Sequence, residues 1–198
     1  MSILFNISKS LVDFVLQDHV SHSKNKKILS IELVPFKMHG KNVRAVLSKE
    51  LWKEVCKLTH ERNNHMCCEC GKTRREVILE CHEVWEYKFD DVNPVMKMTN
   101  MLSLCHQCHM GKHIKFAERN GELEAVKLHL MKLYNLSALQ FNWKVYKSVA
   151  NIRTISNINF SLDLTYMNHL RYKSIHRQIG RQFTTHENSH CNSSFNDE

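Results

Sequence analysis

The sequence predicts an α+β fold, and three observations lead to this prediction. Segments in which apolar and polar residues alternate, as in strands, occur near residues 28–34 and 158–166. Between them lie segments whose apolar residues recur every three or four positions, as in amphipathic helices. In the same region stand two Cys-x2-Cys pairs, Cys67/Cys70 and Cys105/Cys108. With 198 residues, of which 42% are hydrophobic, the chain can bury one domain core.

The chain divides into three parts by composition. Residues 1–27 form an N-terminal extension that ends in the polar stretch "SHSKNKK". Residues 28–166 carry the periodic segments and form the domain, with its centre at 60–116. Residues 167–198 form a tail that is first basic and then rich in Ser and Asn, a composition typical of disordered segments.

Strands are expected where the apolar residues alternate. We expect residues 28–34 to pair with 158–166 as a small antiparallel strand pair that joins the two ends of the domain. The β-rich "EVILEC" predicts a further strand before His82. Residues 86–100 are predicted to be a polar loop.

Four helices are expected. One begins after Ser48, a favourable N-cap, and carries an apolar stripe up to "RNN". The second begins within the second cysteine pair and ends near residue 120. The third covers about 123–133, and the fourth runs from Ser137 to about Val149. Trp52, Trp85 and Trp143 lie in or near predicted elements, so we expect them in the core.

The paired cysteines indicate a metal site. Four thiolates complete a tetrahedral Zn²⁺ site with no open position, and Gly71 eases the turn after the first pair. The ligands would be Cys67, Cys70, Cys105 and Cys108. The remaining cysteines (Cys56, Cys68, Cys81 and Cys191) do not have this spacing. The alternative, that some paired cysteines are simply buried apolar residues, does not account for two correctly spaced pairs.

The charge predicts an anionic partner. The chain has 28 Lys and Arg against 20 Asp and Glu, a net charge of +8 and a pI near 9.1, so nucleic acid is the expected partner and a merely basic surface is the alternative. An acid-free stretch in the tail is expected to contact phosphates through Arg171, Lys173, Arg177 and Arg181. No signal peptide and no apolar run of membrane-spanning length are recognised, so we expect a soluble cytoplasmic protein without a membrane partner.

The cysteine pairs enclose "LECHEVW" and "NMLSLCHQCHMGKH", and this arrangement resembles the HNH endonuclease family of bacterial and phage type. The resemblance is specific across 67–113 and looser across 28–166. It implies a treble-clef ββα-metal core with a structural zinc, flanked by additional helices. It also implies hydrolysis of a DNA phosphodiester bond with one divalent ion (Mg²⁺, Mn²⁺ or Ni²⁺), in the setting of a phage or mobile element.

The residues allow more than one assignment of roles. His109 and His113 are four apart on a predicted helix, so both can bind one divalent ion. If Glu80 aligns with the Glu that often precedes the first family motif, His82 becomes a metal ligand and Glu83 the base. If His82 is the base, Cys81 stands at the ligand position, which favours soft metals.

The candidate catalytic residues are thus His82, Glu83 and Asn100, the last as a ligand or a residue that shapes the loop. His106 and His109 can instead support the zinc site, and Asn100 can be a turn residue. Three functions follow from these readings: an endonuclease, a zinc-dependent nucleic-acid-binding protein that does not cut, and a zinc-scaffolded protein-interaction domain.

Overall fold

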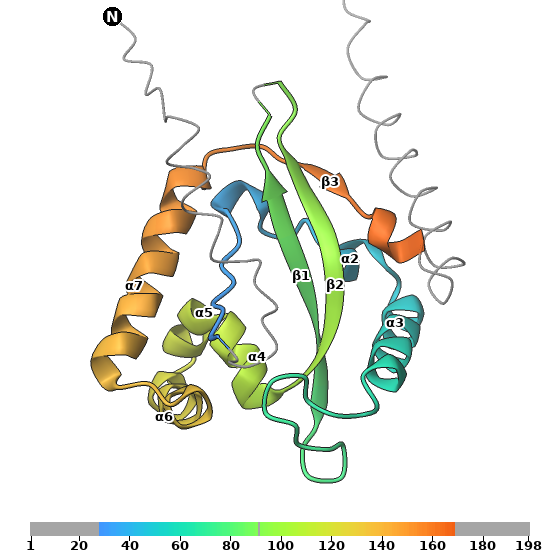
Figure 1. Ribbon diagram of the computed structural model, residues 1–198. Coiled ribbons are helices and arrows are strands. Elements are labelled where there is room, and N and C mark those ends of the chain that lie inside the picture. The colour runs from blue at the N-terminus through green and yellow to red at the C-terminus, as the bar shows by residue number, and fades with distance from the viewer. Residues whose placement is uncertain (1–27, 91, 169–198) are drawn as a thin grey trace, which may run out of the picture.

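A computed structural model describes residues 28–90 and 92–168 of the chain. The predicted N-terminal extension and the four tail cations, Arg171, Lys173, Arg177 and Arg181, lie outside these ranges. The centre of the fold is a long antiparallel hairpin made of β1 (Leu79–Lys88) and β2 (Val95–Cys105). A short third strand, β3 (Ser161–Asp163), joins the free edge of β2 in parallel, so the sheet order is β1-β2-β3. In Figure 1 the hairpin runs through the middle of the molecule, with helices on both sides.

The hairpin replaces the polar loop that we predicted for residues 86–100. Met96 and Met98 are buried and alternate with Lys97 and Thr99, as a strand requires. The alternation then changes phase, because Val84 pairs with Asn100 while Trp85 pairs with Met98, which leaves Thr99 as the extra residue of a β-bulge. This change of phase is why the sequence pattern did not indicate one continuous strand.

One side of the sheet is covered by two helices, α2 (Val43–Val46) and α3 (Lys49–Arg62). The predicted N-cap of α3 is confirmed, since the Ser48 side chain accepts a hydrogen bond from the amide of Leu51. The hydrophobic core on this side is formed by Val43, Leu47, Val55, Met98, Met101, Leu164 and Met167. Met167 is fully buried, so the packed domain continues past residue 166 into the short 3-10 helix η3 (Thr165–Asn168).

The other side is covered by four helices, α4 to α7 (Figure 1). Their bounds are α4 His106–Lys112, α5 Ile114–Arg119, α6 Leu123–Tyr134 and α7 Ala138–Ile155. The single helix predicted from the second cysteine pair to residue 120 is thus broken at His113, whose φ and ψ are −105° and 47°. The start of α7 is as predicted, with a capping box between Ser137 and Gln140.

The predicted antiparallel strand pair does not form. Residues 28–35 have no regular secondary structure before η2 (Phe36–Met38), and the predicted partner is reduced to β3, which pairs with β2 instead. The alternation at the start of the domain was nevertheless meaningful, because Leu29 and Ile31 are buried. They pack among α4–α7, and the amide of Glu32 donates to the carbonyl of Lys112 (3.0 Å).

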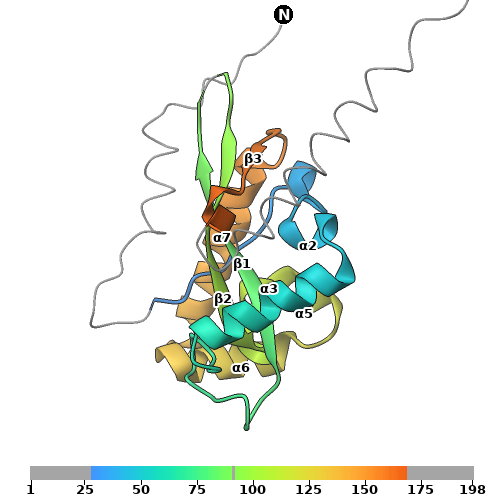
Figure 2. The same ribbon diagram turned by 90° about the vertical axis from the view of Figure 1, so that its right-hand side faces the viewer.

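Figure 2 shows the same layers from the side, with α3 crossing in front of the hairpin. The described residues therefore form a mixed α+β fold with six α-helices and a small three-stranded sheet. Within these residues, no helix combines the length and the apolar character that crossing a membrane requires.

Candidate metal centres

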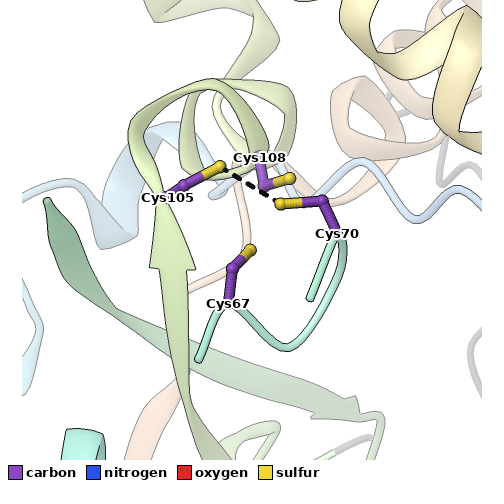
Figure 3. A group of neighbouring side chains, drawn as sticks. All are labelled: Cys67, Cys70, Cys105 and Cys108. Carbon is purple, nitrogen blue, oxygen red and sulfur yellow. Dashed lines mark hydrogen bonds between the residues drawn. The ribbon is translucent and has the colours of Figure 1, made fainter. Parts of the chain in front are cut away.

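The four predicted zinc ligands lie together. Cys67 and Cys70 come from the loop after α3, Cys105 ends β2, and Cys108 lies in the first turn of α4; Figure 3 shows all four side chains pointing toward one centre. Their sulfur atoms lie within 4.8 Å of one another, and Cys70 Sγ is 3.7 Å from Cys105 Sγ. A zinc ion with Zn–S bonds of about 2.3 Å requires sulfur atoms roughly 3.8 Å apart at the corners of a tetrahedron. The cluster therefore fits a zinc ion, and it joins the loop, the strand and the helix.

The chemistry of these thiols also suits a cation. Hydrogen bonds from Cys105 and Cys108 hold the pKa of Cys67 well below its usual range. The hydrogen bond with Cys105 in turn raises the pKa of Cys108. Four thiolates in so small a volume repel one another unless a cation joins them, and a divalent ion removes this repulsion.

The turn at the first cysteine pair, residues 67–71 and called the knuckle below, is tight. Gly71 has a φ of +76° and donates its amide to the carbonyl of Cys67 (2.9 Å), as predicted for the residue that eases the turn. Cys68 points away from the cluster and donates its thiol to Asn63 Oδ1 (3.1 Å). Among the described residues, only the four cysteines with x2 spacing meet at this centre.

Two neighbours of the cysteine cluster were not anticipated from the sequence. His129 of α6 places Nε2 3.1 Å from Cys108 Sγ, close enough for its N–H to donate to a thiolate. Tyr134, also on α6, donates its hydroxyl to Glu69, one of the two residues between Cys67 and Cys70. Both residues lie more than 20 positions away from the residue that they contact, so spacing alone gave no signal for them.

A second cluster is made of His82 on β1 together with His109 and His113 at the two ends of the last turn of α4. Their ring nitrogens lie within 4.8 Å of one another. The ring centroids are 5.3 Å apart for His82 and His109, and 4.9 Å for each of the other two pairs. The predicted shared face of His109 and His113 is thus present, and it meets the strand that carries His82. Three imidazoles at this separation can bind one divalent ion and leave coordination positions open.

Carboxylates occupy one nitrogen of two of these rings. Glu32 Oε2 lies 3.0 Å from His82 Nε2, and Glu80 Oε2 lies 2.5 Å from His109 Nδ1. The other nitrogen of each ring remains for a ligand. Glu80 also reaches His106 Nδ1 (2.8 Å), whose Nε2 lies 2.6 Å from Glu122. His106 is therefore a neighbour of the histidine cluster through Glu80, and no contact of His106 with the cysteine cluster is seen among the described residues.

The electrostatics favour a metal-binding protonation state of His82, His113 and Glu32 at neutral pH. Burial, helped by the proximity of His82 and His109, lowers the pKa of His113 to about 3. Burial also lowers the pKa of His82. For Glu32, burial acts to raise the pKa, but the hydrogen bond with His82 and the charge of Lys112 lower it to about 2. Neutral imidazoles beside ionised carboxylates are the form in which such residues bind metal ions.

A buried lysine connects the two clusters. Lys112 of α4 lies between two carboxylates, with Nζ 3.3 Å from Glu32 and 3.0 Å from Glu69. Burial acts to lower the pKa of Lys112, but the charges of Glu32 and Glu69 raise it, so the side chain is an ammonium ion. The chain of contacts therefore runs from Glu69 in the knuckle, through Lys112, to Glu32 and His82.

The three histidines line a wide cavity of about 1580 Å³. Its walls are residues 30–34, 38–42 and 44, strand β1, part of β2, the helices α4 and α5, and part of α7. Cationic side chains on two of these walls are Lys41, Arg44, Lys115 and Arg119. The cavity is large enough to admit a chain segment of another molecule to the imidazoles.

Two other predicted catalytic residues, Glu83 and Asn100, also line this cavity, but their side chains make other contacts. The side chain of Glu83 points to the opposite face of β1 from His82. It accepts a hydrogen bond from the backbone amide of Arg44 (3.2 Å). Asn100 Oδ1 accepts hydrogen bonds from Arg62 (2.8 Å) and Tyr166 (3.0 Å), which tie β2 to α3 and η3. The structure therefore does not bring Glu83 or Asn100 to the three imidazoles.

Comparison with protein-family models, with curated proteins and with solved structures finds no match to this chain. The fold and the two clusters alone define its class. It is an α+β protein with a group of four cysteines compatible with zinc and a separate group of three histidines that can hold a metal ion.

Proposed function

We propose that this protein is an HNH-type endonuclease that hydrolyses phosphodiester bonds of DNA with a divalent metal ion and carries a structural zinc in a treble-clef ββα-metal core. One observation carries the proposal. The cysteine cluster joins β2 to α4, and α4 together with β1, the partner strand of β2, brings His82, His109 and His113 to one point. The motif resemblance across 67–113 and the net charge of +8 support the same reading.

The residues of the chain have distinct tasks in this proposal. The three imidazoles hold the ion, and Glu32 and Glu80 fix the orientation of two of them. Bound there, a divalent ion supplies stabilisation of the negative charge that develops on the scissile phosphate. Lys115 and Arg119 on the α5 wall bind flanking phosphates of the substrate.

The contacts of His82 favour the assignment in which it is a ligand and not the base. It meets two other imidazoles and is held by Glu32, as a metal-binding histidine is held by its carboxylate. Three nitrogen ligands suit Ni²⁺ and, less strongly, Mn²⁺, whereas Mg²⁺ prefers oxygen ligands. We therefore expect Ni²⁺ and Mn²⁺ to support cleavage better than Mg²⁺.

The test is cleavage of supercoiled plasmid by the purified full chain with each of the three ions. His109→Ala is expected to abolish nicking, and Glu80→Gln to reduce its rate by about 10–100-fold, because Glu80 orients His109. His65→Asn is the matched control: His65 lies in the loop before the first cysteine pair, and its φ of 52° is one that Asn also adopts. Equal nicking by the parent and by His109→Ala would contradict the proposal.

A second candidate function has its own observation. Because Glu83 and Asn100 are turned away from the imidazoles, the site lacks two of the expected catalytic groups. This favours a zinc-dependent protein that binds nucleic acid without cutting it. In the same experiment, that protein would retard the plasmid in a gel and leave it intact with every ion, and the retardation would weaken steeply with salt.

A further inference from the structure

Helix α7 carries an exposed apolar stripe, two of whose three side chains are aromatic. The residues Leu139, Trp143 and Tyr146 are 80%, 59% and 63% exposed. Their spacing of four and three residues places them on one face of the helix, while Phe141 on the opposite face is buried. The exposure of Trp143 corrects our expectation that this side chain belongs to the core.

The two rings of the stripe are already nearly parallel to each other. Trp143 and Tyr146 stack with their centroids 5.5 Å apart and an angle of 21° between the ring planes. An exposed flat surface of this kind fits a planar aromatic ligand, because such a ligand adds to the stack through its own π-face.

The stripe stands in a basic part of the chain. Residues 125–162 contain no Asp or Glu, but they contain Lys127, Lys132, Lys144, Lys147 and Arg153. Lys147 follows Trp143 by four positions and Arg153 follows Tyr146 by seven, so both cations lie on the same face as the rings. A planar ligand that also carries negative charge therefore complements this face in both shape and charge.

We propose that this face of α7 binds single-stranded nucleic acid, with bases stacked on Trp143 and Tyr146 and phosphates against Lys147 and Arg153. Unpaired bases offer free π-faces to the rings, whereas the bases of a duplex are stacked on each other. Trp143, Tyr146, Lys147 and Arg153 do not line the histidine cavity, although Thr154 near the end of α7 does. The proposal therefore does not depend on the chain being a nuclease.

A second copy of the chain is a poorer occupant of this face. In a symmetric pair the same patch meets itself, so Lys147 and Arg153 of one copy would lie close to the same cations of the other. Residues 125–162 contribute no carboxylate to such a contact, although Glu124 of α6 shares a hollow with Tyr146.

The proposal is tested by fluorescence anisotropy with the full chain and no added divalent ion. The labelled probes are oligo-dT, oligo-U and a duplex, each about 20 nucleotides long, which is longer than a typical single-strand binding site. The double variant Trp143→Leu/Tyr146→Leu keeps an apolar surface but removes the rings. We expect it to bind both single strands roughly 5–100-fold more weakly than the parent, the range observed when base stacking is lost. Trp143→Phe/Tyr146→Phe keeps the rings and is expected to retain most of the affinity.

Two controls distinguish base stacking from non-specific apolar contact and from electrostatic attraction. Leu128→Ala removes a similarly exposed apolar side chain (65%) from α6 and should leave binding unchanged. Lys147→Gln/Arg153→Gln should reduce the slope of log K against log salt by about 1.4, since each phosphate contact on a single strand contributes roughly 0.7. The leucine double variant should leave this slope nearly unchanged.

The outcomes that overturn the proposal are distinct. Equal affinity of the leucine double variant and the parent for both oligonucleotides would exclude stacking at this face. Sedimentation that shows self-association of the parent, preserved in the leucine variant and weakened by Trp143→Asp, would assign the face to a second copy. His109→Ala distinguishes this proposal from the proposed nuclease activity. It should lose cleavage and keep oligonucleotide binding, so each proposal can fail independently of the other.

Discussion

At the scale of single residues, the two metal centres are built from side chains whose neighbours matter as much as the ligands. One pair of cysteine sulfurs has the separation that a zinc ion requires, His129 contacts Cys108, and Glu69 holds Lys112. In the histidine cluster, the carboxylates of Glu32 and Glu80 each fix one imidazole. Cys108, His82 and His109 therefore each depend on a second residue, and of the three partners only Glu80 lies within the quoted motif.

The first prediction compares two neighbouring cysteines. Cys108→Ser should reduce the zinc content from one ion per chain to near zero and lower the Tm by at least about 10 °C, because metal binding stabilises only the folded state. Cys68→Ser should change neither, since the Cys68 thiol lies outside the cluster. Elemental analysis and a thermal melt measure both quantities. A strong chelator at neutral pH should reproduce the Cys108→Ser melt, and an unchanged melt after verified zinc removal would contradict the structural role.

The second prediction concerns Glu83. Burial raises its pKa to about 7, although the amide of Arg44 acts to lower it. The folded state therefore holds this proton more tightly than the unfolded state, so the free energy of unfolding decreases as pH rises from about 4.5 to about 7. Glu83→Gln removes this loss and should raise the stability at about pH 8 by roughly 1–3 kcal/mol, with no gain at about pH 4. Urea unfolding at both pH values measures the difference; equal gains at the two pH values would mean that this carboxyl does not titrate as described.

At the scale of secondary-structure elements, the position of α4 decides the geometry of both centres. It begins directly after Cys105, carries Cys108 and His109 in its turns, and ends at His113. Helix α6 packs across it at Gly111, where a Cβ atom would lie 2.7 Å from Leu130 Cδ1. The absence of a side chain at Gly111 thus permits the close approach that brings His129 to Cys108.

The third prediction tests this approach. Gly111→Val should lower the free energy of unfolding by about 1–3 kcal/mol, the usual cost of forcing extra methyl groups into a packed core. Leu130→Ala creates space at the same point, so the double variant should lose at least about 0.5 kcal/mol less than the sum of the two single variants. Urea unfolding of the four proteins measures this coupling. Simple additivity would indicate that the two helices do not meet as described.

At the scale of the whole molecule, the hairpin separates two hydrophobic cores, and a buried ionic network joins the two metal centres. One core lies between the sheet and α3, and the other lies among α4–α7 and residues 29–31. Lys112 connects the knuckle residue Glu69 to Glu32, which in turn holds His82. The segment before η2 is thereby held against α4 by charge as well as by the burial of Leu29 and Ile31.

The fourth prediction concerns this network. Lys112→Met leaves two buried carboxylates without their cation, so the free energy of unfolding should fall by about 3–5 kcal/mol. The triple variant Lys112→Met/Glu32→Gln/Glu69→Gln removes the unpaired charges and should be more stable than Lys112→Met alone. Urea unfolding at neutral pH compares these two variants with the parent. A loss below about 1 kcal/mol in Lys112→Met would show that the network is well solvated.

The sequence by itself determined the features that arise within one turn or one helix, such as the cysteine pairs, the helix starts and the face shared by His109 and His113. The x2 spacing predicted which four cysteines meet, Ser48 and Ser137 marked the starts of two helices, and the four-residue spacing placed His109 and His113 on one face. These features follow from the geometry of a single turn or a single helix, which the sequence specifies directly.

Only the tertiary structure decided which elements lie next to one another. The edge of β2 accepted β3 in parallel, residues 28–35 packed against α4 instead of forming a strand, and a bulge at Thr99 concealed the hairpin from the alternation pattern. The same arrangement directed Glu83 and Asn100 away from the imidazoles and brought Glu32 and Lys112 toward them. Such contacts depend on packing between distant segments, for which a single sequence carries no local signal.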